Sequence, residues 1–252
     1  MLSNITINPY RFDTSLPYTS GLGSDGNWTS VANLTTDAVA TNPSGFVSAG
    51  LTKSWLSDGS STEISLSAGQ IFPVNSDLTF CCWIRPTTIK SQIIISSDVN
   101  YYFVVYFQQA GARMEYIVKD GTGNQVGTEA DYSWESDEWQ MVACTFDESA
   151  GQAIGYVYSS DGTPTTVIDR TNTDVDTVAT NTDWKMMGQS TETFTGRILS
   201  PCIWNVVLSS ADLTALSNSG NGAEMNTIQK EQIVCYWDSQ TGTAPILNLA
   251  IP

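Results

Sequence analysis

A series of short apolar segments, separated by polar turns, dominates the sequence from about Gly45 onward. Stretches such as DLTFCCWIRP, RMEYIVKD and AIGYVYSSDG have the length of β-strands and are bounded by residues that favour turns. Roughly a dozen such segments follow one another at intervals of roughly 8–15 residues, and no helices alternate with them in the β-α-β manner. This pattern predicts an all-β fold in which antiparallel strands form a two-sheet sandwich.

The segment at residues 78–86 indicates that the sheets are covered on more than one face. Successive side chains of a strand point to opposite faces. One face of this segment would carry Leu78, Phe80, Cys82 and Ile84. The other would carry Thr79, Cys81 and Trp83, which are also largely apolar. Several predicted strands carry apolar side chains on both faces, and a single sheet with one face in water would not bury them.

The first 45 residues differ in composition from the rest of the chain. They are rich in Ser, Thr, Asn, Asp and Gly, and stretches such as GLGSDGNWTS and TNPSG are typical of turns and loops. They lack the apolar residues for a core of their own. We therefore expect an irregular N-terminal arm or an elaborated sheet edge at residues 1–45, followed by one sandwich domain at residues 46–252.

One short helix is predicted after the apolar stretch IWNVVL. Ser209 is a favourable N-cap, and Asp212 stands three residues later, as in a capping box. Leu208 before the cap is placed to pack on Leu213, and Gly220 is placed to end the helix.

Composition excludes several classes of function. The formal net charge of −16, from 10 basic and 26 acidic residues, argues against nucleic acid or an anionic membrane surface as a partner. Histidine is absent, which excludes histidine-based catalysis and histidine-ligated metals. The five cysteines stand in apolar runs without a CxxC pair, and this favours buried free thiols, although one bridged pair remains an alternative.

Three segments resemble the signature segments of laminin G-like domains in the concanavalin A-like lectin/glucanase superfamily. They are DLTFCCWIRP, DEWQMVACTFD at residues 137–147, and FTGRILSPCIWNVVLSSADLTALSNSG at residues 194–220. The resemblance covers about residues 46–220. It implies a jelly-roll sandwich of two curved sheets, core positions for Trp83, Trp139 and Trp204, and a C-terminal strand, QIVCYWD, that returns beside the N-terminal region.

The resemblance also provides a test for catalysis. Hydrolases of the superfamily need carboxylates that alternate on one strand face in an E-x-D-x-E pattern, which brings acid and nucleophile to the same cleft. The nearest string here is EADYSWE, in which Glu129 and Asp131 share a face but position 133 is Ser133 and Glu135 is out of phase. We therefore predict no catalytic residues and a protein that is not an enzyme.

Calcium binding in the pentraxin-like branch implies clustered oxygen ligands just before the F-x-G-x-I strand. The corresponding stretch, GQSTETFTG, offers only Glu192 and the amide of Gln189. Acidic loops at residues 96–100 and 172–183 are alternative sources of oxygen ligands. We assign no cofactor and no metal-binding residues, and Ca²⁺ stays an open alternative.

Loop aromatics are the remaining candidates for ligand binding. Tyr132 and Trp134 lie in a predicted loop, where they could stack on the face of a sugar ring, and Tyr101 and Tyr102 are alternatives.

Two functions remain. The first is a structural or decoration protein of a virion, with a bacteriophage as the expected source and glycan adhesion as an additional role at its surface. The start of the sequence lacks a basic region and an apolar region of the signal-peptide type, so we expect synthesis in the host cytoplasm. Its partners would be other virion subunits, contacted through residues 1–45, in a homo-oligomer or a larger assembly. The alternative is a free-standing lectin module.

Overall fold

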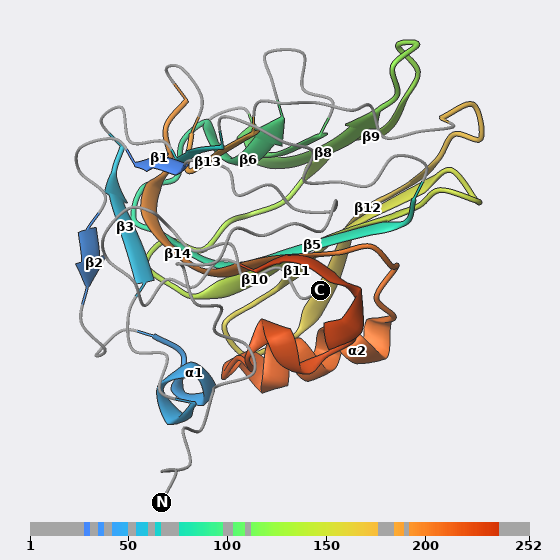
Figure 1. The fold of residues 1–252 in the computed structure, drawn as a ribbon. Helices are drawn as coiled ribbons and strands as arrows, with labels where there is room; N and C mark the ends of the chain where they lie inside the picture. The colour runs from blue at the N-terminus through green and yellow to red at the C-terminus, as the bar shows by residue number, and fades with distance from the viewer. Residues whose placement is uncertain are drawn as a thin grey trace, which may run out of the picture.

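A computed structural model of the chain describes residues 28–30, 35–37, 42–49, 54–59, 64–66, 76–97, 103–108, 112–175, 184–188 and 192–236. These residues form two stacked antiparallel sheets with a thin helical layer outside one of them (Figure 1). The seven-stranded sheet has the order β1 (Trp28–Ser30), β4 (Ile64–Leu66), β13 (Trp184–Met186), β6 (Gln92–Ser97), β7 (Phe103–Gln108), β8 (Arg113–Lys119), β9 (Gln125–Asp131). The prediction of a two-sheet jelly-roll sandwich is confirmed.

The second sheet has eight strands. Its order is β12 (Pro164–Thr171), β11 (Gln152–Tyr158), β10 (Gln140–Asp147), β5 (Leu78–Pro86), β14 (Thr195–Trp204), β3 (Ser54–Asp58), β2 (Thr35–Asp37). The remaining strand, β15 (Ile233–Tyr236), pairs with β14. One side of β14 is occupied by β5, so β15 and β3 both pair with its other side, at different points along β14. The described part of the C-terminal strand therefore lies on the same side of β14 as β3, at the other end of β14.

Strand β5 is covered on both faces, as its sequence predicts. Leu78, Phe80, Cys82 and Ile84 belong to the core between the two sheets. Cys81 and Trp83 belong to a second apolar cluster on the outer face of the eight-stranded sheet. The four cysteines whose side chains are described, Cys81, Cys82, Cys144 and Cys202, are buried free thiols.

The outer cluster is closed by the helical layer. This layer comprises α1 (Ser44–Ser48), α2 (Ser210–Ser217) and the 3-10 turns η2 (Asn218–Gly220), η3 (Met225–Thr227) and η4 (Lys230–Gln232). Trp83 and Trp204 are fully buried in the cluster, and Trp139 is 8% exposed. The indole of Trp204 donates to the Ile228 carbonyl at 2.9 Å. The three tryptophans therefore have the core role that the resemblance implied.

Helix α2 begins as predicted. The Ser209 hydroxyl accepts from the Asp212 backbone N–H at 3.2 Å, and the Asp212 carboxylate accepts from the Ser209 N–H at 3.1 Å, which completes a capping box. Leu208 and Leu213 are buried in the same cluster. The C-cap, however, is Asn218 in the left-handed conformation, not Gly220, because asparagine also tolerates that region. Gly220 ends the following 3-10 turn instead.

The described part of the predicted N-terminal arm takes part in the sandwich. Strand β1 pairs with β4 at the edge of one sheet, and β2 pairs with β3 at the edge of the other. A helix that the sequence analysis did not predict, α1, spans the expected boundary at residue 45 and buries Phe46 completely. Most of residues 1–45 lie outside the described part of the chain, so the division into an arm and a domain stays a prediction.

The turn between β8 and β9 contains a buried carboxylate. Asp120 is 2% exposed and accepts four hydrogen bonds of 2.8–3.0 Å from the backbone and side chains of Thr122 and Asn124. Burial alone would raise its pKa, but these hydrogen bonds outweigh burial and lower the pKa of Asp120 below its ordinary value. Asn124 also donates to the Asp174 carbonyl, which ties the hairpin to the segment after β12.

A lowered pKa means that ionised Asp120 stabilises the fold above the unfolded-state pKa and that this contribution is lost as the pH falls through the folded-state value. We expect Asp120→Asn to lower the free energy of unfolding by about 1–3 kcal/mol at pH 7. The difference from wild type should shrink toward pH 3, as measured by urea denaturation across pH. Glu138→Gln, at an exposed position, is the control. A constant difference across pH would contradict this role.

Candidate functional site

The loop that joins β9 to β10 carries both aromatic residues predicted for ligand binding. It passes from the seven-stranded sheet to the eight-stranded sheet across one end of the sandwich. Backbone hydrogen bonds hold it at both ends, from Tyr132 N–H to the Ala112 carbonyl at 3.2 Å and from Asp137 N–H to the Pro86 carbonyl at 2.7 Å. We call the group of Arg113, Glu129, Asp131 and Tyr132 the β9 rim.

Trp134 is not an exposed platform, and the expectation that its ring is offered to a sugar is wrong. It is 7% exposed, and its ring is stacked on Phe107 at a centroid distance of 3.8 Å. Its indole N–H donates to the Arg113 carbonyl at 3.2 Å. The loop folds back over the open end of the sandwich, and Trp134 fills the space between the sheets because burying a large aromatic side chain is favourable.

Tyr132 is partly exposed and keeps the role of candidate. Its ring meets Trp134 edge to face, with centroids 4.8 Å apart, so Trp134 supports it from the core side. Its hydroxyl donates to the Gln140 side-chain oxygen at 3.4 Å. Burial, and secondly the negative charge of Glu135, raise the pKa of Tyr132 to about 12. The hydroxyl is therefore neutral at physiological pH; its hydrogen is donated to Gln140, and its oxygen can accept a hydrogen bond.

The carboxylates next to Tyr132 are engaged by an arginine. Glu129 and Asp131 share a strand face, as predicted, and Arg113 on β8 lies opposite Asp131 in the register. The guanidinium pairs with Glu129 through one terminal nitrogen and with Asp131 through Nε at 2.9 Å. A positive group therefore stands where the acid and nucleophile of a hydrolase would have to act on a substrate. Glu135, the third candidate, does not join them, and its Oε2 is buried without a hydrogen-bond partner.

Sequence reasoning missed Arg113, although the sequence contains the signal. Residues 113–119 and 125–131 flank the turn-forming stretch DGTGN, and counting outward from this turn places Arg113 opposite Asp131.

The stretch considered for calcium contains one described carboxylate, Glu192. It accepts a hydrogen bond from the Tyr106 hydroxyl, and its backbone carbonyl accepts from the Ile93 N–H. Burial, followed by this hydrogen bond, raises the pKa of Tyr106. Gln189, Tyr101, Tyr102 and most of the loops at 96–100 and 172–183 lie outside the described residues.

The described residues contain neither a metal-binding cluster nor a membrane-spanning helix. Within them, no group of three or more Cys, Asp or Glu side chains is placed to hold a metal ion. No helix in the same part of the chain is long and apolar enough to cross a membrane.

Comparison with known families identifies the class of the protein. Residues 58–214, more than half of the chain, match the family described as the concanavalin A-like lectin/glucanases superfamily, laminin G type. The chain belongs to this superfamily. No curated protein sequence matches it.

Solved structures agree with this fold. The binding domain of Paraclostridial Mosquitocidal Protein 1 has a TM-score of 0.61 at 13% identity over 78% of this chain and 48% of that one. The enzymatically active domain of tailspike protein 2 of bacteriophage CBA120 has a TM-score of 0.58 at 11% identity over 86% of this chain and 33% of that one. The binding domain of botulinum neurotoxin DC, solved in complex with SialylT, has a TM-score of 0.55 at 11% identity over 77% and 46%.

The chain thus spans about half the length of the two toxin binding domains and a third of the tailspike chain. At these identities the likeness concerns the fold alone.

The burial of Trp134 leads to a testable difference between the two aromatic residues of the loop. We expect Trp134→Ala to lower the free energy of unfolding by about 3–5 kcal/mol, the usual cost of deleting a buried aromatic side chain. Tyr132→Ala should cost clearly less, because that ring is partly exposed. Chemical denaturation measures both values. Equal and small losses would show that Trp134 is not part of the core.

Proposed function

We propose that this chain is a non-catalytic glycan-binding domain of a virion and that the β9 rim is its ligand-binding site. The observation that carries the proposal is that the ion-paired side chains of Arg113, Glu129 and Asp131 are open to solvent at the end of β9, where the partly exposed Tyr132 follows them in the chain. Such an end of a strand suits a sugar, whose hydroxyls exchange hydrogen bonds with charged groups and whose C–H face packs on an aromatic side chain.

The charges of the rim support binding rather than hydrolysis. The side chains of Arg113, Glu129 and Asp131 are 31%, 36% and 88% exposed, so a ligand can reach them. A retaining or inverting hydrolase needs one carboxyl group as acid and another as nucleophile or base, on either side of the bond that breaks. Here both carboxylates contact the same guanidinium, which leaves them suited to accept hydrogen bonds from hydroxyl groups.

The virion context rests on different support. Part of the enzymatically active domain of a bacteriophage tailspike shares the fold, and the net charge of −16 suits a soluble surface component whose copies repel one another. Strands β1 and β2, both from residues 1–45, form edges of the two sheets, on the left of Figure 1. Edge strands have unpaired backbone groups through which a neighbouring subunit can add. The free-standing lectin remains the alternative.

We expect the purified chain to bind at least one glycan on a glycan array, in the presence of Ca²⁺ and also in the presence of a chelator. Tyr132→Ala should weaken that binding about tenfold or more, because the variant loses the ring contact. Tyr156→Ala, which removes another partly exposed tyrosine on β11, is the matched control and should bind like wild type. No bound glycan, or equal affinities for all three proteins, would contradict the proposed site.

For the virion context, we expect mass spectrometry of purified particles to detect this chain and cross-linking to join its residues 1–45 to another subunit. In solution, native mass spectrometry should report an oligomer. A monomer that loses residues 1–45 rapidly to protease, together with its absence from particles, would favour the free-standing lectin.

A further inference from the structure

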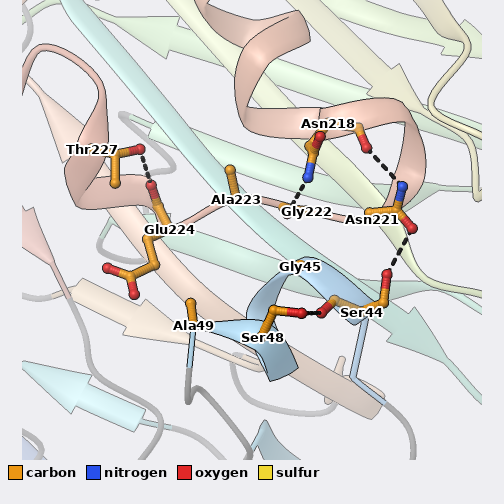
Figure 2. Close-up of a pocket in the computed structure, with 10 residues that line it drawn as sticks. All are labelled: Ser44, Gly45, Ser48, Ala49, Asn218, Asn221, Gly222, Ala223, Glu224 and Thr227. Atoms are coloured by element: carbon orange, nitrogen blue, oxygen red, sulfur yellow. Dashed lines mark hydrogen bonds between the residues drawn. The ribbon is translucent and has the colours of Figure 1, made fainter.

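A shallow polar hollow lies in the helical layer, between α1 and the segment that follows α2 (Figure 2). It has a volume of about 690 Å³ and is open to solvent, so a ligand there would be covered on one side only. The polar side chains that line it are Ser44, Ser48, Asn218, Asn221, Glu224 and Thr227. They come from two parts of the chain that are about 175 residues apart in sequence, and none of them belongs to the β9 rim.

The two walls of the hollow are fixed against each other. The Gly45 N–H donates to the Asn221 carbonyl at 2.8 Å, and the Ser44 hydroxyl donates to Asn221 Oδ1 at 2.7 Å. A Cβ at Gly45 would lie 1.9 Å from the Gly222 carbonyl oxygen, so the backbones approach as closely as only glycine allows. Phe46 anchors α1 from below, with its ring edge to face with Trp83. The hollow is thus preformed, which reduces the entropy lost on binding.

Internal hydrogen bonds orient the side-chain amides of Asn218 and Asn221 and use only part of their hydrogen-bonding capacity. Asn221 Nδ2 donates to the Asn218 carbonyl at 3.2 Å, and Asn218 Nδ2 donates to the Gly222 carbonyl at 3.0 Å. Each amide nitrogen carries two hydrogens and each amide oxygen accepts two hydrogen bonds. Each amide therefore keeps one N–H hydrogen that can be donated to a ligand. The Asn221 oxygen and the Ser44 hydroxyl can each accept a further hydrogen bond from a ligand at the exposed surface.

The lining also restricts the charge of the ligand. Among the residues around the hollow there is one carboxylate, Glu224, and no Lys or Arg. A single carboxylate is too few for a Ca²⁺ site, which takes six to eight oxygens, and the absence of a cation in the lining disfavours an anion. Groups that both donate and accept, without net positive charge, match a ligand made of neutral hydroxyls.

We propose that this hollow is a second binding site, separate from the β9 rim, and that it takes one residue of a neutral saccharide. Because α1 and residues 218–227 each form a wall, a bound saccharide joins the start of the domain to the segment after α2. Binding should therefore hold α1 in place as well as fill the hollow. This site does not depend on ligand binding at the rim.

The test is a ¹⁵N NMR titration of the full chain with glucose, galactose, mannose and N-acetylglucosamine. We expect saturable shifts of the Asn218 and Asn221 amide signals with at least one of the four. That sugar should also slow hydrogen exchange in residues 44–49. Asn221→Ala should weaken binding about tenfold, the effect of losing one or two hydrogen bonds.

Ala49→Tyr should block the site without removing any of the hydrogen bonds named above, so it tests the hollow even if Asn221→Ala perturbs the fold. Ser210→Ala, at an exposed position on α2, is the control and should bind like wild type. The proposal is overturned if none of the four sugars shifts the hollow signals saturably, or if Ala49→Tyr binds as wild type does.

Discussion

The eight-stranded sheet is buried on both faces, and both the sandwich core and the helical layer form against it. On its inner face, β5 and β14 pack against the seven-stranded sheet through side chains such as Phe80 and Ile203. On its outer face, the same two strands hold Trp83 and Trp204 under the helical layer. Each fully buried side chain of this size contributes about 1.5–3 kcal/mol or more. Without the outer cluster, neither α1 nor the segment after α2 would have a surface to pack on.

The sequence carries the signals for this core because they are local. The alternation in residues 78–86 was sufficient to assign Phe80 and Trp83 to opposite faces, and both assignments are confirmed. The capping box of α2 could likewise be derived from Ser209 and Asp212 alone. Periodicity and capping depend on neighbours in the chain, so they are readable before the fold is known.

Features that depend on distant contacts were not readable in the same way. Trp134 has the sequence surroundings of an exposed loop residue, and only the position of Phe107 beneath it makes it part of the core. The segment SGFVS is too short to predict as a helix, and α1 is held in place by the burial of Phe46 and the close approach of Gly45 to Gly222. Of the two predicted site residues, Tyr132 keeps its candidate role and Trp134 supports it from behind.

Function follows from the side chains placed on this scaffold rather than from the scaffold itself. The β9 rim continues the seven-stranded sheet, whereas the polar hollow belongs to the layer outside the eight-stranded sheet, so the two proposed sites use different parts of the sandwich (Figure 1). The rim combines charged groups with a nearby tyrosine, and the hollow combines amides, hydroxyls and one carboxylate with the small side chains of Ala49 and Ala223. Two sites of unlike chemistry suit a domain that holds an extended ligand at more than one point.

The central claim is that the domain binds a glycan and leaves it intact. The most direct measurement is to incubate the purified chain with a glycan that it retains, and to analyse both the complex and the free glycan by mass spectrometry over time. The account predicts a complex that contains the unshortened glycan, and free glycan of unchanged mass. Shortened products that accumulate in excess over the protein, and that disappear in a Glu129→Gln, Asp131→Asn variant, would contradict it.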